Sequence, residues 1–391
     1  MKISKANLRI IQDSRGQDTL EAEFFSQEFK TIASVPAGKS KGKFETLSIE
    51  PNIALQKFEG IKNQLFNADF SSIVEFDNLL KQLDGTLDKS NLGGNLILVL
   101  SIGFTKLLAK SNNLETYQLI EQALGKKAHK FPYLYFNLIG GGLHAKDSLP
   151  FQEYILVTKF NSPAKGLEYA KSTVEKLRID IEKNFNEVRT GDEGAFAIKS
   201  DNPELGLEIL DRNVNDPNVS LALDVAASSF YIDGKYKIGD KFLSTGELLE
   251  LYAIFVGKFP LISIEDPFSE DDRVGFIKIC KGLAEKVRII GDDLTVTNVE
   301  LIKKAEGEKA ATGVIIKPNQ IGSVSKTLDA IRLAQSYNWM VIVSHRSGET
   351  MDDFIADLAY GVGADGLKSG APTQTQRLTK YNRLIEIERN L

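Results

Sequence analysis

Five short apolar runs in the second half of the chain each end on a residue with a charged or polar side chain. The five residues are Asp224, Glu265, Asp292, Lys317 and His345. Apolar runs of four to eight residues are typical of strands that are buried on both faces. In a barrel of parallel strands the carboxyl ends of all strands meet around one mouth. The pattern therefore predicts that three carboxylates and a lysine gather at one place.

Strand and helix signals alternate along residues 128–391. Residues 154–157 are typical of a strand and residues 164–185 of a helix, and the alternation continues beyond them. It indicates a parallel sheet with crossover helices, and the segment has about the roughly 250 residues of a (β/α)₈ barrel. A doubly wound open sheet is the alternative, but we find no GxGxxG nucleotide-binding motif. We expect an α/β fold with a C-terminal (β/α)₈-type TIM barrel at 128–391.

The first part of the chain, residues 1–127, shows a different order of strand and helix signals. Residues 8–11, 19–25 and 30–35 are typical of strands, and the pattern from 53 to 124 is helical. Strands followed by helices indicate a smaller N-terminal α+β domain. A polar stretch around residue 128 marks the predicted boundary between the two domains.

Composition narrows the class of protein. The formal net charge of −5 argues against a nucleic-acid partner, because such proteins usually carry a basic patch. A single cysteine, Cys280, fits a reducing, cytoplasmic setting. Residues 1–9 are too polar for a signal peptide. The apolar run 96–108 carries Lys106 and is shorter than the roughly 20 residues of a membrane span, so we expect no span.

Asp224, Glu265 and Asp292 are candidate metal ligands. Carboxylate oxygens suit a hard cation such as Mg²⁺. Each acid alone could equally be the N-cap of the helix that follows its strand. Three acids at successive strand ends favour a metal site. Asp293, the neighbour of Asp292, is expected to point away from that site.

Lys317 directly follows a predicted buried strand and is a candidate general base. Its alternative is a lysine that reaches the rim of the barrel. A base needs a pKa near roughly 7–8, about three units below that of an ordinary lysine, which corresponds to about 4 kcal/mol. Burial and nearby cations can supply this shift, and Mg²⁺ and Lys368 are the cations that we expect.

Polar loops supply the remaining candidates. Arg346 and Ser347 follow a predicted strand and could grip an anion, although such a loop also caps helices. Ser40 and Glu193 lie in glycine-containing stretches that could equally be ordinary surface turns, and His144, behind a glycine turn, could equally be structural. Gln152 and Glu153 precede the predicted strand 154–157 and could face the same mouth.

Several of these strings together closely resemble the enolase family, and the resemblance covers nearly the whole chain. The strings are Gly191-Asp192-Glu193-Gly194, Leu223-Asp224-Val225-Ala226, Ser263-Ile264-Glu265-Asp266, Gly291-Asp292-Asp293-Leu294, Lys317-Pro318-Asn319-Gln320 and Ser344 to Thr350. Agreement of this many motifs, in order, is far more specific than one match. The resemblance implies a phosphopyruvate hydratase, which converts 2-phospho-D-glycerate reversibly to phosphoenolpyruvate and water with two Mg²⁺ ions per site.

The resemblance also implies a role for each candidate. Lys317 would be the base at C2 and Glu193 the acid at the C3 hydroxyl. Asp224, Glu265 and Asp292 would hold the first Mg²⁺, and Ser40, in a lid loop, would help to hold the second. The implied substrate contacts are His144, Gln152, Glu153, His345, Arg346, Ser347 and Lys368.

Assembly and two other functions remain open at this point. The family implies a homodimer or a larger ring of dimers. One alternative function is a related barrel enzyme that acts on a sugar acid without phosphate, which would not need Ser40, Arg346 and Ser347. The other is a binding role without catalysis, in which Glu193 and Lys317 would be free to change. The lid carries three lysines, Lys39, Lys41 and Lys43, where the family usually has other residues.

Overall fold

The computed structural model describes residues 1–38, 42–145 and 148–391. In this part of the chain eight strands close into a barrel, because the last strand pairs with the first. In order around the barrel the strands are β4 (Tyr133–Gly140), β5 (Glu153–Thr158), β8 (Val219–Asp224), β12 (Leu261–Glu265), β13 (Arg288–Gly291), β14 (Gly313–Ile316), β15 (Met340–Ser344) and β16 (Gly366–Lys368). The closed ring confirms the predicted barrel, and the open sheet is wrong.

Strand β5 is antiparallel to both of its neighbours, whereas the other barrel strands run parallel. This differs from the uniformly parallel sheet that the alternation indicated. A parallel pair needs a long crossover, usually a helix, but the described part of the β4–β5 connection holds only the short helix η1 (Gly142–His144). The register pairs Glu153 with both Gly140 and Asp224. The first residue of β5 therefore lies at the same mouth as the last residues of β4 and β8.

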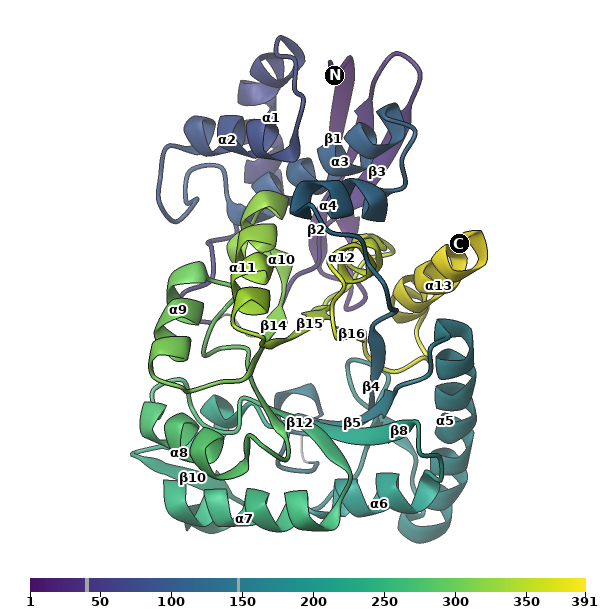
Figure 1. Cartoon of the computed structure of the whole chain (residues 1–391), viewed down its shortest axis with the longest axis vertical. Coiled ribbons are helices and arrows are strands. Elements are labelled where there is room, and N and C mark those ends of the chain that lie inside the picture. The colour runs from purple at the N-terminus through teal and green to yellow at the C-terminus, as the bar shows by residue number, and fades with distance from the viewer. Residues whose placement is uncertain (39–41, 146–147) are drawn as a thin grey trace.

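Helices surround the barrel (Figure 1). They are α5 (Pro163–Phe185), α6 (Leu205–Asn213), α7 (Thr245–Lys258), α8 (Arg273–Leu283), α9 (Val299–Gly307), α10 (Pro318–Ile321), α11 (Val324–Ser336), α12 (Phe354–Gly361) and α13 (Thr375–Asn390). Shorter elements lie in the connections: β6 (Arg189–Thr190), β7 (Phe196–Ala197), η2 (Ala227–Phe230), β9 (Tyr231–Ile232), β10 (Lys235–Ile238) and β11 (Lys241–Leu243).

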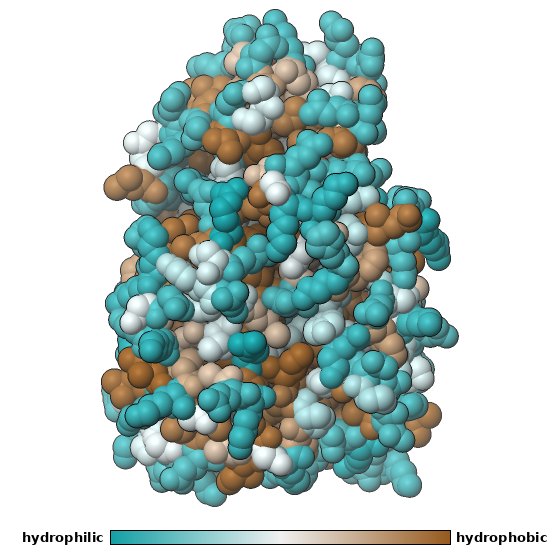
Figure 2. All heavy atoms as spheres, viewed as in Figure 1, coloured by the Kyte–Doolittle hydropathy of each residue, from teal (hydrophilic) through white to brown (hydrophobic). Residues whose placement is uncertain are grey.

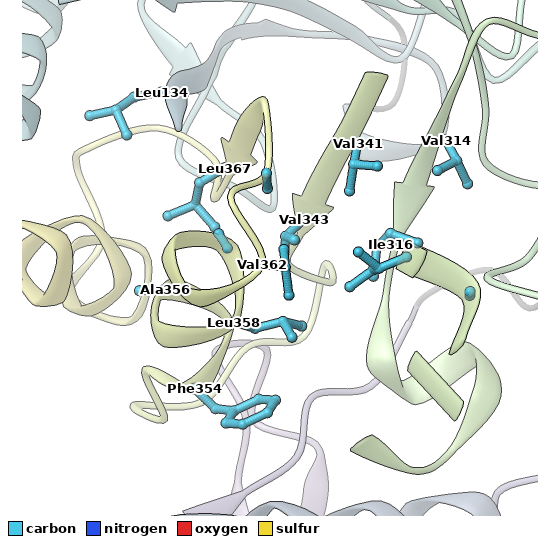
Figure 3. Packing of buried hydrophobic residues seen from close by; sticks show 14 of the residues in the cluster. Leu134, Val314, Ile316, Val341, Val343, Phe354, Ala356, Leu358, Val362 and Leu367 are labelled. Atoms are coloured by element: carbon cyan, nitrogen blue, oxygen red, sulfur yellow. The ribbon is translucent and has the colours of Figure 1, made fainter. Parts of the chain in front are cut away.

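The barrel strands bury both of their faces, because successive side chains point to opposite sides of a strand. One small cluster comes only from barrel strands and includes Ile290, Ile315 and Ile342. The alternate residues, such as Val314 and Ile316, belong to the larger core that includes the surrounding helices. Figure 3 shows such residues of β14 and β15 together with residues of α12. Burial on both faces explains why these strands appear in the sequence as continuous apolar runs.

The N-terminal part is the predicted α+β domain. An antiparallel sheet of β1 (Lys5–Gln12), β2 (Asp18–Phe25) and β3 (Lys30–Ser34) packs against α1 (Pro51–Phe66) and α3 (Gly94–Ser111). The helices α2 (Ile73–Asp84) and α4 (Thr116–Leu124) pack against α3. By length and composition alone α3 could cross a membrane, but 78% of it is buried inside the protein. It is therefore a core helix of this domain, as the sequence predicts for residues 96–108.

The N-terminal domain covers one end of the barrel (Figure 1). Ala37 and Gly348 exchange two backbone hydrogen bonds of 2.9 Å. The backbone N–H of Thr46 donates to the carbonyl of Gln320 at 2.9 Å. These contacts fall on the segments that follow β15 and β14, so the domain lies over the mouth where the strands end. On the face that Figure 2 shows, hydrophobic side chains lie in small groups among hydrophilic ones.

Candidate active site

A cavity of about 250 Å³ opens at the mouth of the barrel, beneath the N-terminal domain. Most of the predicted site residues line it: His144, Gln152, Glu153, Glu193, Asp224, Asp292, Lys317, His345, Arg346, Ser347 and Lys368. Glu265 does not line the cavity but contacts Lys368, which does. Ser40 lies outside the described residues. The structure therefore brings eleven of the thirteen candidates together around one cavity, and a twelfth contacts one of them.

Lys368, the last residue of β16, connects three carboxylates at the centre of the site. Its ammonium lies 2.8 Å from Asp224 Oδ2, 2.7 Å from Glu265 Oε2 and 3.0 Å from Glu153 Oε2. All four side chains are almost completely buried. Burial alone would lower the pKa of Lys368, but the charges of Asp224, Glu153 and Glu265 raise it well above its usual value. Lys368 is therefore a fixed cation.

The side of the cavity that holds the predicted base, called the base side below, consists of Lys317 and Asp292 with two residues that hold them, Asp266 and Gln320. The Lys317 ammonium donates to Asp292 Oδ2. Gln320 Nε2 donates to Asp292 Oδ1 at 3.0 Å. Asp266 accepts from the backbone N–H of Asp292 at 2.9 Å and from that of Asp293 at 2.7 Å. The turn after β13 is thus fixed by a buried carboxylate that the sequence analysis did not single out.

Asp293 corrects a prediction. It was expected to point away from the site, yet it lines the same cavity as Asp292. The alternation of side chains holds only within a strand, and both residues follow the last residue of β13. Burial, and then the neighbouring charge of Asp292, raise the pKa of Asp293 to about 7.

Lys317 is protonated in this structure, whereas a general base has to be neutral. Burial alone would lower the pKa of Lys317, as the sequence analysis expected, but the Asp292 carboxylate outweighs burial and the net pKa is raised. Burial raises the pKa of Asp292 in turn, and Lys317 outweighs that effect, so the net shift is downward. The two residues form an ion pair in the free site, with Lys317 protonated.

The side of the cavity that holds the predicted acid, called the acid side below, consists of Glu193, His144, Glu153 and His345. Glu193 Oε2 lies 3.4 Å from His345 Nε2, and Glu193 Oε1 lies 3.7 Å from His144 Nδ1. Asn137, on β4, donates to Glu193 Oε2 at 3.2 Å. His144 Nδ1 also lies 3.4 Å from Glu153 Oε1. One imidazole therefore lies between two carboxylates.

The loop that carries Glu193 needs its glycines. Gly194 has φ +78°, a conformation that other residues rarely adopt. A Cβ on Gly191 would lie 2.6 Å from the carbonyl oxygen of His144. The close approach that these glycines allow brings Glu193 against His144 and leaves it buried.

Charges on the acid side favour ionised Glu193. Burial would raise the pKa of Glu193, but His345 and His144 lower it well below its usual value. Burial lowers the pKa of His345, and its net shift stays downward. For His144, burial also acts downward, but the charge of Glu193 and the contact with Glu153 leave the pKa raised. In the free site the shared proton of this cluster therefore resides on His144, and Glu193 is ionised.

Arg346 occupies the predicted position of an anion grip, and an acid of this chain holds it. Its guanidinium binds Glu45 with both nitrogens, Nη1 to Oε2 at 3.0 Å and Nη2 to Oε1 at 3.2 Å. Nη1 also donates to Asn319 Oδ1 at 3.2 Å. This is the geometry in which arginine also binds phosphate. Glu45 comes from the N-terminal domain, so the grip joins the two domains.

Models of the two enolase domains match the chain almost from end to end. The model described as "Enolase, N-terminal domain" matches residues 3–120, and "Enolase, C-terminal TIM barrel domain" matches residues 128–391. The chain belongs to the enolase family.

Full-length relatives agree with this assignment. The enolase of Ehrlichia ruminantium (strain Welgevonden) is 38% identical over 411 residues, which cover 100% of this chain and 97% of that protein. The enolase of Thermococcus gammatolerans is 38% identical, with 100% and 95% covered, and that of Pyrococcus furiosus is 38% identical, with 98% and 94% covered. The chain therefore spans nearly the full length of the enolases that it matches.

The donor set fits the Mg²⁺ that the enolase family implies. Asp224, Glu265 and Asp292 are oxygen donors, which a hard cation prefers. Within the described part of the chain, the buried Oε1 of Glu265 has no hydrogen-bond partner. Burial, and then the charge of Asp224, raise the pKa of Glu265 well above its usual value. Burial and repulsion by Asp224 disfavour the ionised form of Glu265, and a divalent cation beside it would stabilise that form.

The three predicted ligands do not form a closed cage in this structure. Among the described residues, two groups have ligand atoms within 4.8 Å of one another: His144, Glu153 and Glu193, and Asp266, Asp292 and Asp293. Asp292 belongs to the second group, while Asp224 and Glu265 are bound to Lys368 instead. In this enolase chain two lysines supply the positive charge at the predicted ligands.

Proposed function

We propose that Lys317 and Glu193 are the base and the acid of this enolase. As a member of its family the chain is a hydro-lyase, a phosphopyruvate hydratase, which interconverts 2-phospho-D-glycerate and phosphoenolpyruvate. The observation that carries the proposal is that both side chains line one cavity but have separate partners. Lys317 pairs with Asp292, while Glu193 contacts two histidines. Two independent proton-transfer groups at one substrate are what a stepwise elimination of water needs.

The ionisation of the free site suits the hydration direction. Protonated Lys317 can give its proton to C2 of phosphoenolpyruvate, and ionised Glu193 can take a proton from the water that adds to C3. The dehydration direction requires both groups to exchange states. An anionic substrate beside Glu193 raises the pKa of that carboxyl, and any compensation of the Asp292 charge lowers the pKa of Lys317.

Asp224, Glu265 and Asp292 are the residues that we assign to the first Mg²⁺, and Ser40 to a second one that arrives with substrate. The bound metal supplies positive charge to the substrate carboxylate, which stabilises the extra negative charge left when C2 loses its proton. Asp266 and Gln320 keep Asp292 oriented for this purpose through the hydrogen bonds described above.

The remaining roles follow the position of each side chain. Arg346 and Ser347 bind the phosphate, with Gln152 and His345 nearby, while Lys368, His144 and Glu153 contact the rest of the substrate. In this proposal residues 1–127 form the domain that caps the site and residues 128–391 carry it. We also propose a cytoplasmic homodimer or larger homo-oligomer, with neither a nucleic acid nor a membrane as partner.

A coupled absorbance assay for phosphoenolpyruvate tests the proposal. With 2-phosphoglycerate and Mg²⁺ we expect turnover that a chelator abolishes and added Mg²⁺ restores. Turnover of a sugar acid without phosphate, and none of 2-phosphoglycerate, would favour the related barrel enzyme. Binding of 2-phosphoglycerate without any turnover would favour a protein that has lost catalysis.

A further inference from the structure

Arg377, on α13, is a completely buried residue that the reaction above does not use. Its guanidinium holds three consecutive residues after β15. Nη1 lies 2.6 Å from His345 Nδ1 and donates to the carbonyl of Arg346 at 2.6 Å, while Nη2 donates to the carbonyl of Ser347 at 2.6 Å. Nε donates to Gln374 Oε1 at 3.4 Å. One side chain therefore fixes both a predicted acid-side histidine and the backbone of the phosphate grip.

The contact with His345 determines where that imidazole carries its proton. A guanidinium has donors and no acceptor. His345 Nδ1 must therefore accept this hydrogen bond, and the ring proton lies on Nε2. Nε2 is the nitrogen that lies 3.4 Å from Glu193 Oε2. In general, the partner of one ring nitrogen sets the protonation of the other.

We propose that Arg377 is a positioning residue that holds His345 as the neutral Nε2–H tautomer, so that His345 presents an N–H to Glu193. It acts through His345 and does not touch the substrate. The proposal rests on the proposed role of Glu193 as the acid. Without Arg377 the ring can place its proton on Nδ1 and turn an unprotonated nitrogen toward a carboxylate, which removes a hydrogen bond that stabilises the ionised form of Glu193.

The charge of Arg377 supports a role beyond packing. Within the described ranges no carboxylate lies within ion-pair distance of Arg377, so its hydrogen bonds go to neutral acceptors, while its charge acts on Glu193 and Glu349 from farther away. A buried charge without a counter-ion in direct contact is expensive, and an apolar side chain could fill the same volume. Lys380, one turn along the same helix, is also buried but pairs with Glu349 at 2.7 Å. The difference indicates that Arg377 serves through its hydrogen bonds to these neutral acceptors and not through an ion pair.

Nitrogen NMR of ¹⁵N-histidine-labelled protein, without metal or substrate, tests the proposal directly. The chain has only three histidines, His129, His144 and His345, so each can be assigned with one substitution. We expect His345 to show a non-protonated Nδ1 and a protonated Nε2. A proton on Nδ1, or on both nitrogens, in the wild-type protein would overturn the proposal, and this measurement needs no variant to fold.

Two variants extend the test to catalysis. In Arg377→Met we expect the His345 spectrum to change and hydration of phosphoenolpyruvate, which uses ionised Glu193, to fall by about tenfold or more, while exchange of the C2 hydrogen with solvent, which depends on Lys317, continues. Tyr381→Phe is the matched control, because Tyr381 is buried on the same helix and its hydroxyl contacts Ser369, Tyr135 and Gly370 instead. We expect the control to keep the ratio of exchange to turnover.

The outcomes separate this inference from the proposed function. An unchanged His345 spectrum in folded Arg377→Met, or the same exchange ratio in both variants, would reduce Arg377 to a structural residue. Failure of the acid assignment would appear elsewhere, as normal dehydration by Glu193→Gln, and it would leave the tautomer of His345 as measured.

Discussion

The two sides of the cavity are built in different ways and carry opposite charge patterns. On the base side, Asp292 and Lys317 directly follow parallel strands, and an ion pair holds them together. On the acid side, Glu193 lies in a glycine-containing loop and its neighbours come from η1, β5 and the segment after β15. The base side holds a cation through a carboxylate, whereas the acid side holds a carboxylate through imidazoles. The scaffold thus favours protonated Lys317 and ionised Glu193 before any ligand binds.

This difference teaches that each reactive group is held in the state opposite to the one that dehydration needs. Bound ligands must therefore change both states, and they act on the two sides with opposite signs. Positive charge is needed next to Asp292, and negative charge is needed next to Glu193. Substitutions that disable one side while leaving the other intact test this comparison directly.

The largest effect is expected from Lys317→Ala, which removes the reactive group of the base side. Proton transfer at C2 then lacks its base, and turnover should fall by roughly 10³–10⁴-fold. Exchange of the C2 hydrogen with deuterated solvent should stop as well, which mass spectrometry of recovered substrate measures. Lys326→Ala, on the exposed face of α11, is the control and should turn over normally. Persistent C2 exchange in Lys317→Ala would remove Lys317 from its assigned role.

Glu193→Gln disables the acid side with an isosteric neutral group. We expect dehydration to fall by roughly 10²–10³-fold, because the C3 hydroxyl leaves without a proton donor. Exchange at C2 should continue, since Lys317 and Asp292 are untouched. Parallel measurements of exchange and of phosphoenolpyruvate formation separate the two steps. Glu187→Gln, an exposed acid near the same loop, controls for the lost charge. Equal loss of exchange and turnover in Glu193→Gln would mean that the two sides do not act independently.

The strand-end residues could be predicted from the sequence, because burial on both faces leaves a visible signature. Asp224, Glu265 and Asp292 each follow an apolar run that the structure confirms as a barrel strand. Glu153 was expected to face the mouth although it precedes the predicted strand 154–157, and it is the first residue of β5. The antiparallel direction of β5 makes that placement correct, and the strand pattern alone did not reveal this direction.

Other parts of the site leave no local pattern. Glu45 and Arg346 meet although 301 residues separate them in the chain. Arg377 lies in an amphipathic helix and resembles any other helical arginine until its acceptors are known. The ionisation of Lys317 could not be predicted either, because it depends on a carboxylate in direct contact and not on burial alone.

A medium effect is expected beneath the loop after β15, at the buried pair of Glu349 and Lys380. Glu349 accepts from the backbone N–H of Arg346 at 3.2 Å and from that of Thr350 at 3.0 Å, so it shapes the loop that carries the phosphate grip. Glu349→Gln leaves the Lys380 ammonium buried without its counter-ion. We expect the free energy of unfolding at pH 7 to fall by about 3 kcal/mol, measured by urea denaturation.

The pH dependence of that loss has a definite sign. Burial would raise the pKa of Glu349, but Lys380 outweighs it and the folded pKa lies below the ordinary value of 4.5. The contribution of Glu349 is therefore fully present above about pH 4.5 and is lost as the pH falls through the lower folded pKa. The difference in the free energy of unfolding between wild type and Glu349→Gln should therefore shrink as the pH is lowered. The exposed pair of Glu300 and Lys303 is the control, and Glu300→Gln should change stability by less than about 0.5 kcal/mol. A difference that stays constant down to pH 3.5 would show that Glu349 acts through shape alone.

The smallest effect concerns Glu45, a residue of the N-terminal domain that belongs to neither side of the cavity and binds Arg346. Its carboxylate occupies both Arg346 nitrogens that we assign to phosphate, so an incoming anion has to share or displace it. Glu45→Gln removes the competing charge and keeps the size of the side chain. We expect inorganic phosphate to bind more tightly by about 1 kcal/mol, roughly fivefold in Kd, in isothermal titration calorimetry. Glu59→Gln removes the same charge from an exposed site of the same domain and should change nothing. Weaker binding in Glu45→Gln would mean that Glu45 orients Arg346 for the anion, in which case the grip depends on the N-terminal domain even before substrate arrives.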